Sequence, residues 1–274
     1  MKLLEVKQEF NKILKSANID DINHNINVIL EYVTGLNYSQ ILLLEDISED
    51  VYKKAYDLIS KRATGYPLQY IVGKVEFLGN TIEVNPSVLI PRNETEQLCE
   101  IISKKADNKS VLDLCTGSGC IGLGIKANSK AIVDLSDVSS DALKVAQHNA
   151  EINHLDVNII KSNLFDNITK KYDIIVSNPP YLTSLDMTKL QKEVTYEPKL
   201  ALYGSEDGLD FYRKIIEDCV QHLNPNGEIY FEYGMGQAQD IEKLLKKDFE
   251  CITIIKDYYN IERFIYAKLK ENIC

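Results

Sequence analysis

"VLDLCTGSGCIG", residues 111–122, joins an apolar run to a glycine turn and the beginning of a helical pattern. The apolar run predicts a buried strand, and residues 117–122 fit the pattern G-x-G-x-x-G. Glycines suit a turn in which the backbone adopts positive φ and a ligand approaches closely. A strand, a glycine turn and a helix in this order predict the ligand-binding half of a doubly wound α/β sheet.

Downstream of Ser110, runs that predict strands alternate with helical patterns. The strand runs cover residues 110–114, 131–135, 157–162, 172–176, 228–233, 251–256 and 263–269, and helical patterns at 139–152 and 208–223 lie among them. This alternation predicts an α/β fold with a largely parallel sheet. Only "DYYNIE" joins the last two runs, which is too short for a helical crossover, so we expect an antiparallel final hairpin. Seven such strands resemble the Rossmann-like sheet of the class I methyltransferases.

The chain before this region has a different pattern. Within residues 1–73 apolar residues recur at helical spacing, as in Val51, Ala55, Leu58 and Ile59, which predicts a small N-terminal bundle of about four short helices. Residues 74–90 contain two strand-like runs around Gly79-Asn80, which predict a β-hairpin linker. We therefore expect a helical domain at 1–73, the linker at 74–90 and a catalytic domain at 91–274.

Composition restricts the possible partners. The net charge is −10, and no cluster of Lys and Arg is long, so we expect no stable nucleic-acid binding. No apolar run approaches the ~20 residues that span a bilayer, and the charged N-terminus does not resemble a signal peptide, so we expect a cytoplasmic protein without membrane contact. The six cysteines and four histidines show no metal-ligand spacing, so no metal site is expected.

The glycine turn by itself leaves two cofactors open. Asp137, at the end of the second strand run, suits hydrogen bonds from ribose hydroxyls in either a dinucleotide or S-adenosylmethionine. Asp113, just before the turn, favours S-adenosylmethionine, because a carboxylate attracts an ammonium or sulfonium group and repels a pyrophosphate. Asp113 could equally hold the loop through backbone N–H groups.

The fourth strand run ends in "VSNPPYL", residues 176–182, and this ending favours methyl transfer. The two prolines have fixed φ and no N–H, so the segment is stiff and presents acceptors: the Asn178 side-chain oxygen and the Pro179 carbonyl. Two fixed acceptors suit a planar –NH₂ group, and Tyr181 provides an aromatic face beside it. Holding both N–H bonds would orient the nitrogen toward a methyl donor.

These blocks resemble the glutamine-N-methyltransferases that modify peptide-chain release factors. The resemblance also covers "YPLQYIVGKVEFLGNTIEV", "LIPRNETEQL", "YEPKLALYGSEDGL", "FEYG" and "DYYNIERF", between residues 66 and 264. It implies methylation of the glutamine N5 in the Gly-Gly-Gln motif of a release factor, with the helical domain helping to hold that partner. It implies S-adenosylmethionine as the cofactor.

Site residues follow from the same resemblance. Catalytic roles are implied for Asn178, Pro179, Pro180 and Tyr181. Arg92 and Glu94 could line the active site or cap a helix, and capping is the favoured interpretation. Glu197, Glu232 and Arg263 are interpreted as buried ion-pair or loop-holding residues rather than catalytic ones. Cofactor binding is implied for Cys115, Thr116, Gly117, Ser118, Gly119, Asp137, Asn163, Leu164 and Asn178.

Three other functions are compatible with parts of the pattern. An NPPY motif also serves DNA and RNA amino-group methyltransferases, such as those that act on adenine N6, although the acidic composition disfavours them. The glycine pattern also occurs in NAD-dependent dehydrogenases. A non-catalytic binding module could keep the same fold.

Overall fold

The computed structural model describes residues 1–271, so Cys274, one of the six cysteines, lies outside the described residues. The chain forms two compact units. One consists of Met1–Lys74 together with Leu190–Tyr196, and the other consists of Val75–Lys189 and the chain from Glu197 onward. The segment 190–196 follows the NPPY motif in sequence but packs within the helical unit.

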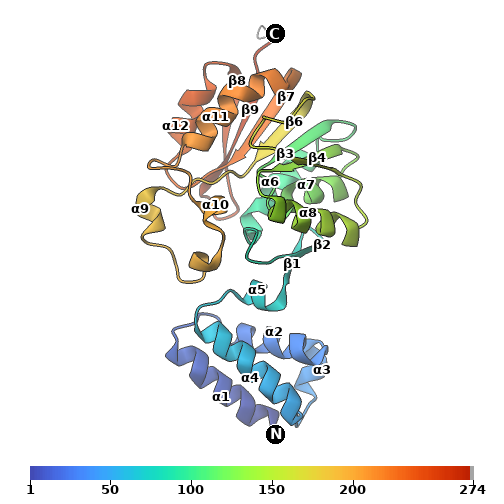
Figure 1. The fold of residues 1–274 in the computed structure, drawn as a ribbon, viewed down its shortest axis with the longest axis vertical. Coiled ribbons are helices and arrows are strands. Elements are labelled where there is room, and N and C mark those ends of the chain that lie inside the picture. Colours follow the sequence, from blue (N-terminus) through green and yellow to red (C-terminus); the bar gives the residue numbers. More distant parts are fainter. Residues whose placement is uncertain (272–274) are drawn as a thin grey trace. The chain divides into compact units, whose positions relative to one another are not determined.

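The first unit contains five α-helices: α1 (Leu3–Ser16), α2 (Ile22–Thr34), α3 (Tyr38–Leu42), α4 (Glu49–Ala63) and α5 (Leu68–Val72) (Figure 1). Its core is apolar, with Phe10 and Leu14 of α1 packed with Ile29 of α2 and Ile59 of α4. The i, i+4 pair Ala55 and Ile59 is fully buried, as the helical spacing predicts. Helix α5, a single short turn after Pro67, exceeds the expected number of helices.

A buried arginine fixes the segment 190–196 inside this unit. Arg62 is 3% exposed, and its Nη2 lies 2.5 Å from the Glu193 carboxylate, while its Nε donates to Asn25 Oδ1 at 2.5 Å. The rings of Tyr66 and Tyr196 meet edge to face with centroids 5.1 Å apart. Because Arg62 and Glu193 are 131 positions apart, no local pattern predicts this pairing.

The second unit begins at Val75, within the two-stranded hairpin of β1 (Lys74–Phe77) and β2 (Asn80–Glu83), which is followed by α6 (Asn93–Ser103). Its main sheet has the strand order β5-β4-β3-β6-β7-β9-β8. All pairs are parallel except β7 with β9 and β8 with β9. The predicted seven-stranded α/β sheet with an antiparallel final hairpin is therefore confirmed. The strands are β3 (Ser110–Leu114), β4 (Ile132–Asp137), β5 (Asn158–Lys161), β6 (Tyr172–Ser177), β7 (Leu223–Glu232), β8 (Phe249–Lys256) and β9 (Glu262–Leu269).

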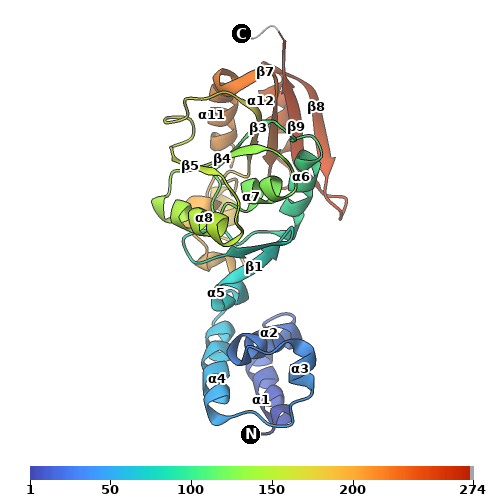
Figure 2. The ribbon, with the colours of Figure 1, turned by 90° about the vertical axis from the view of Figure 1, so that its right-hand side faces the viewer.

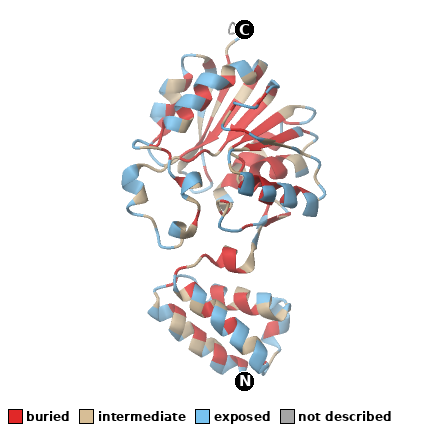
Figure 3. Cartoon of the chain, in the orientation of Figure 1, coloured by how far each residue is buried: buried red, intermediate tan, exposed pale blue. Residues whose placement is uncertain are grey.

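Helices cover both faces of this sheet (Figures 1 and 2). Helices α7 (Cys120–Ala127) and α8 (Ser140–Ile152) lie on one face, and α11 (Asp210–Cys219) and α12 (Ala238–Leu245) lie on the other. Figure 3 shows the central strands of the sheet as largely buried. Short helices α9 (Ser184–Met187) and α10 (Lys199–Leu202) follow the NPPY motif.

The strand order reverses direction between β3 and β6, which positions the candidate site. Strands that run in parallel end at the same edge, and ligands bind where the order reverses. Leu114 and Ser177 are register partners at these two carboxyl ends. The Ser177 hydroxyl donates to the Leu114 carbonyl at 2.6 Å, which ties the glycine loop and the NPPY motif together.

Candidate active site

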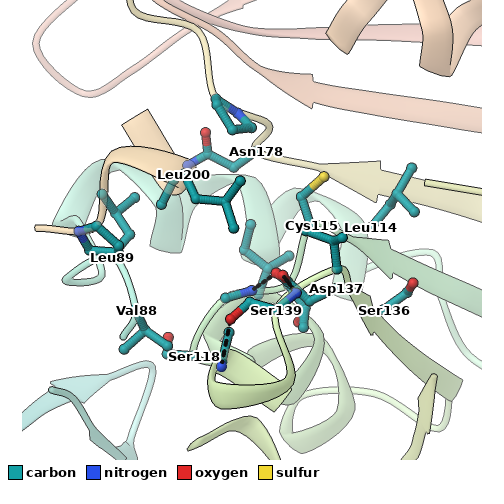
Figure 4. Close-up of a pocket in the computed structure, with 18 of the residues that line it drawn as sticks. Val88, Leu89, Leu114, Cys115, Ser118, Ser136, Asp137, Ser139, Asn178 and Leu200 are labelled. Carbon is teal, nitrogen blue, oxygen red and sulfur yellow. Dashed lines mark hydrogen bonds between the residues drawn. The ribbon is translucent and has the colours of Figure 1, made fainter. Parts of the chain in front are cut away.

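A cavity of about 240 Å³ opens at this edge of the second unit. In Figure 4, Asn178 and Leu200 lie across the cavity from Ser118, Asp137 and Ser139. Other walls come from the loop that precedes α6 and from the segment after β5. The sequence-predicted residues that line it are Cys115, Thr116, Gly117, Ser118, Asp137, Asn163, Leu164, Asn178 and Pro180.

The glycine loop has the conformation that a close ligand requires. Gly117 and Gly119 have φ of 56° and 85°, where residues with a side chain are strained. A Cβ added at Gly117 would meet no atom within 4 Å, so this backbone faces open space. Gly119 does not line the cavity and instead occupies the N-cap position of α7. Gly117 therefore leaves room for a ligand, and Gly119 allows the turn.

Asp137 connects the end of β4 to this loop. Its Oδ2 accepts from the Gly117 N–H at 2.9 Å and its Oδ1 accepts from the Ser139 N–H at 2.8 Å. Burial raises the pKa of the Asp137 carboxyl, although these backbone N–H groups act in the opposite direction. The carboxylate therefore lines the cavity in a fixed orientation, which suits a group that accepts hydrogen bonds from the hydroxyls of a ligand.

Asp113 holds the glycine loop through hydrogen bonds and does not line the cavity. The carboxyl is fully buried, and its Oδ2 accepts from the Thr116 hydroxyl at 2.5 Å and the Gly122 N–H at 2.9 Å. Within residues 1–271 its Oδ1 has no hydrogen-bond partner. Burial raises the pKa of Asp113 to about 7 despite the two donors. Of the two roles considered for Asp113, holding the loop is the one that its contacts match.

The raised pKa of Asp113 has a consequence for stability. In the unfolded chain this carboxyl ionises near its ordinary pKa, whereas the folded protein retains the proton until about pH 7. Asp113 therefore lowers the free energy of unfolding by about 1.4 kcal/mol per pH unit as pH rises between these values. We expect the melting temperature of Asp113→Asn, relative to the native protein, to increase between pH 5 and pH 8. A difference that stays constant with pH would contradict this assignment.

The NPPY motif divides between the cavity and the protein interior. Asn178 and Pro180 line the cavity, whereas Pro179 is buried and no described protein group donates to its carbonyl oxygen. Tyr181 does not line the cavity, and its ring lies against Gly234, where an added Cβ would be 2.9 Å from Cδ2. The Gln237 amide donates to the Tyr181 carbonyl at 3.0 Å. The aromatic wall expected from Tyr181 stays a prediction.

One pair of side chains differs from the sequence interpretation. Arg92 lines the cavity and its Nη2 lies 2.5 Å from Glu197 Oε1, while its side chain makes no capping hydrogen bond to α6. Glu197 is 5% exposed and also accepts from the Ile90 N–H at 3.0 Å. The loop-holding role of Glu197 matches these contacts. The favoured capping role of Arg92 was wrong, because its side chain pairs with Glu197, 105 positions away, and the alternative role of lining the site matches its position.

Several lining residues had no assigned role in the sequence interpretation. Six of them lie in two segments, the loop before α6 and the region of α10 and α11, which the fold brings to the cavity from distant parts of the chain. Four of these six lie in the blocks "LIPRNETEQL" and "YEPKLAL", so the family resemblance was the sequence signal that could have identified them. These lining residues are Val88, Leu89, Pro198, Leu200, Ala201 and Phe211.

Within residues 1–271 no group of three or more His, Cys, Asp or Glu side chains is arranged to hold a metal ion. In the same part of the chain, none of the helices has the length and apolar character needed to cross a membrane.

Comparison with solved structures identifies the fold. A methyltransferase from Pyrococcus furiosus aligns with a TM-score of 0.56 at 21% identity, covering 70% of this chain and 89% of that one. The Thermus thermophilus 16S rRNA N2 G1207 methyltransferase, solved with AdoMet and guanosine, aligns with a TM-score of 0.55 at 19% identity, covering 72% and 50%. At these identities the likeness concerns the fold alone.

Comparisons with protein families and with curated relatives identify the family. The family model described as Methyltransferase small domain matches residues 93–199, so fold and site together define a Rossmann-like methyltransferase. The model described as PrmC N-terminal domain matches residues 5–73. A release factor glutamine methyltransferase of Clostridium acetobutylicum is 36% identical over 97% of this chain and 98% of its own length. One of Streptococcus pneumoniae is 40% identical over 76% and 77%. The chain belongs to the release factor glutamine methyltransferase family.

Proposed function

We propose that this protein transfers a methyl group from S-adenosylmethionine to the side-chain amide nitrogen (N5) of the glutamine in the Gly-Gly-Gln motif of peptide-chain release factors. The observation that carries this proposal is the position of Asn178 in the same cavity as the glycine loop, in a chain of this family. The helical unit is proposed to help hold the release factor. The cytoplasmic location expected from the sequence stays a prediction.

The lining residues fit S-adenosylmethionine. The open space over Gly117 has room for the methionine part, and the fixed Asp137 carboxylate suits the ribose hydroxyls. We assign the adenine to the segment after β5, with Asn163 and Leu164, and the rest of the cofactor site to Cys115, Thr116, Ser118, Gly119 and Asn178. When bound, S-adenosylmethionine supplies an electrophilic methyl group.

The chain's own residues supply binding and orientation. An amide nitrogen is a poor nucleophile because its lone pair is delocalised. The Asn178 side-chain oxygen and the Pro179 carbonyl are proposed to accept both N–H bonds of the glutamine, which would fix the nitrogen and favour the positive charge that develops on it. The nitrogen gains the methyl group and loses one proton. Pro180 keeps the segment rigid, because its ring fixes φ.

The test uses the full chain with purified release factors and S-adenosylmethionine labelled in its methyl group. We expect label in the release factor, and mass spectrometry should map a single methyl group to the glutamine of Gly-Gly-Gln. A release factor with Gln→Ala at this position is the matched control and should stay unlabelled. Label that enters only DNA or RNA in a parallel reaction would favour the nucleic-acid alternative and overturn the proposal.

Asp137→Ala tests the cofactor assignment. The substitution removes an ionised acceptor, and hydrogen bonds to charged groups contribute about 1.5–3 kcal/mol, so the KM for S-adenosylmethionine should rise about 10-fold to 100-fold. Steady-state kinetics and calorimetry measure this change. Asp141→Ala is a useful comparison, because Asp141 also lines the cavity but pairs with the exposed Lys144 at 2.8 Å. Equal effects of the two substitutions would argue against a special role of Asp137.

A further inference from the structure

Glu232 ends strand β7 directly beside the NPPY motif. Ser177 of β6 and Phe231 of β7 are register partners, so the next residues along these parallel strands are Asn178 and Glu232. Glu232 is 2% exposed. The Tyr212 hydroxyl donates to its main-chain carbonyl at 2.8 Å, which fixes the backbone at this point. A buried carboxyl thus lies at the level of the residue proposed to hold the substrate.

The side-chain contacts of Glu232 lead into the cavity. Its Oε2 accepts from the Thr95 hydroxyl at 2.8 Å, and the Asn178 amide, which follows the register pair Ser177 and Phe231 beside Glu232, is near enough to lower the pKa of this carboxyl. Thr95 and Asn178 both line the cavity, whereas Glu232 itself does not. Glu232 therefore lies directly behind two cavity-lining side chains, and its contacts reach the cavity through them.

A carboxylate has no hydrogen to donate, so it dictates which end of the Asn178 amide faces it. Only the –NH₂ end of an amide can donate to a carboxylate, and the amide oxygen then points the other way. We propose that Glu232 is a positioning residue that orients the Asn178 amide so that its oxygen, rather than its –NH₂, faces the acceptor glutamine. This inference rests on the proposed function and names the group that makes Asn178 an acceptor.

Protonation would remove this preference. A neutral carboxyl has an O–H that can donate to the Asn178 oxygen, which allows the amide to turn its –NH₂ toward the cavity. Burial raises the pKa of Glu232 to about 7, and the negative charge of Glu94 acts in the same direction. Thr95, Arg263 and Asn178 each lower this pKa, but their effect is smaller than that of burial. Activity should therefore increase as pH rises through about 7. Other titratable groups in electrostatic range are Tyr181, Tyr212, Cys99 and Cys120.

Nuclear magnetic resonance tests the contact without turnover. In ¹⁵N-labelled protein, the side-chain –NH₂ signals of Asn178, assigned by their loss in Asn178→Asp, should shift with pH with a midpoint near 7. This pH-dependent step in the chemical shift should disappear in Glu232→Gln. It should persist in Asp113→Asn, which removes the other carboxyl of similar pKa. A wild-type signal that does not titrate near 7, or one that titrates unchanged in Glu232→Gln, would overturn the inference.

Thr95→Val provides a second variant that keeps the carboxyl. The Thr95 hydrogen bond lowers the pKa of Glu232, so removing it should move the step in the Asn178 signals to higher pH. A step that stays at the same pH, or moves lower, would contradict the arrangement. This measurement decides the question even if Glu232→Gln does not fold.

Kinetics then separates this inference from the proposed function. With a release factor as substrate, wild-type kcat should rise on the order of tenfold in total as pH rises through about 7, and level off above it. Glu232→Gln should lower kcat at pH 8 on the order of tenfold and remove this rise, with KM for the release factor nearly unchanged. If wild type does not methylate the glutamine, the proposed function fails, while the Asn178 signals still decide the role of Glu232.

Discussion

Asn178→Ala is expected to lower kcat for glutamine methylation by about 10²–10³, by analogy with the loss of one donor from an oxyanion hole. The substitution removes the side-chain oxygen proposed to accept an N–H of the glutamine, and it leaves the Pro179 carbonyl in place. Single-turnover rates at saturating S-adenosylmethionine measure the effect on the chemical step. A loss smaller than tenfold would show that the two-acceptor arrangement is wrong and would favour a non-catalytic role for the motif.

Asn163→Ala is the matched control for this substitution. Asn163 has the same side chain and lines the same cavity, but it lies after β5 and hydrogen-bonds to Asp166 at 3.2 Å. Loss of one neutral hydrogen bond, about 1 kcal/mol, should raise the KM for S-adenosylmethionine about fivefold. The two asparagines should thus differ in which kinetic constant changes. If both substitutions changed only the cofactor KM, Asn178 would belong to the cofactor site alone.

Gly204→Ala should inactivate the protein from outside the cavity. A Cβ at Gly204 would lie 2.5 Å from the Pro180 carbonyl oxygen and 2.7 Å from Tyr181 Cα. Because these are backbone atoms of the NPPY motif, the motif has to move. The hydrogen bond that the Gly204 N–H donates to the Leu182 carbonyl at 2.9 Å would be disturbed as well. A displacement of about 1 Å can reduce a rate 10²-fold, and we expect a loss of at least this size in kcat.

Gly124→Ala controls for the general effect of adding a methyl group to a glycine. Its Cβ would lie 3.2 Å from Phe77 Cε1, a side-chain atom that can yield by a few tenths of an ångström. Thermal melts of both variants separate misfolding from displacement of the motif. A folded Gly204→Ala protein with wild-type kcat would show that the position of Pro180 and Tyr181 does not limit the reaction.

Local sequence patterns were sufficient to predict the scaffold. The seven strand runs correspond to β3 through β9 because each is a short apolar run, and buried strands of a parallel sheet need such runs. The final hairpin followed from the short "DYYNIE" connection. Strand β7 begins five residues before its predicted start, at Leu223 rather than residue 228, because propensity poorly defines where strands begin.

Contacts between distant segments could not be predicted in this way. The Arg92–Glu197 pair, the Arg62–Glu193 pair and the cavity wall at Leu200 each join parts of the chain that have no common periodicity. Arg92 illustrates the limit, because its position before α6 suggested capping, whereas its charge is neutralised by a carboxylate from beyond the NPPY motif. Only the folded chain shows which oppositely charged groups meet.

The sequence by itself determined the α/β sheet, the glycine turn between β3 and α7 and the rigid pair of prolines after β6, because these features depend on propensities and dihedral limits of neighbouring residues. The tertiary structure decided that Asp113 supports the loop, that Tyr181 packs against Gly234, and that Glu232 lies behind Asn178. Burial and pairing across strands set these three outcomes, and both depend on residues brought together from far along the chain.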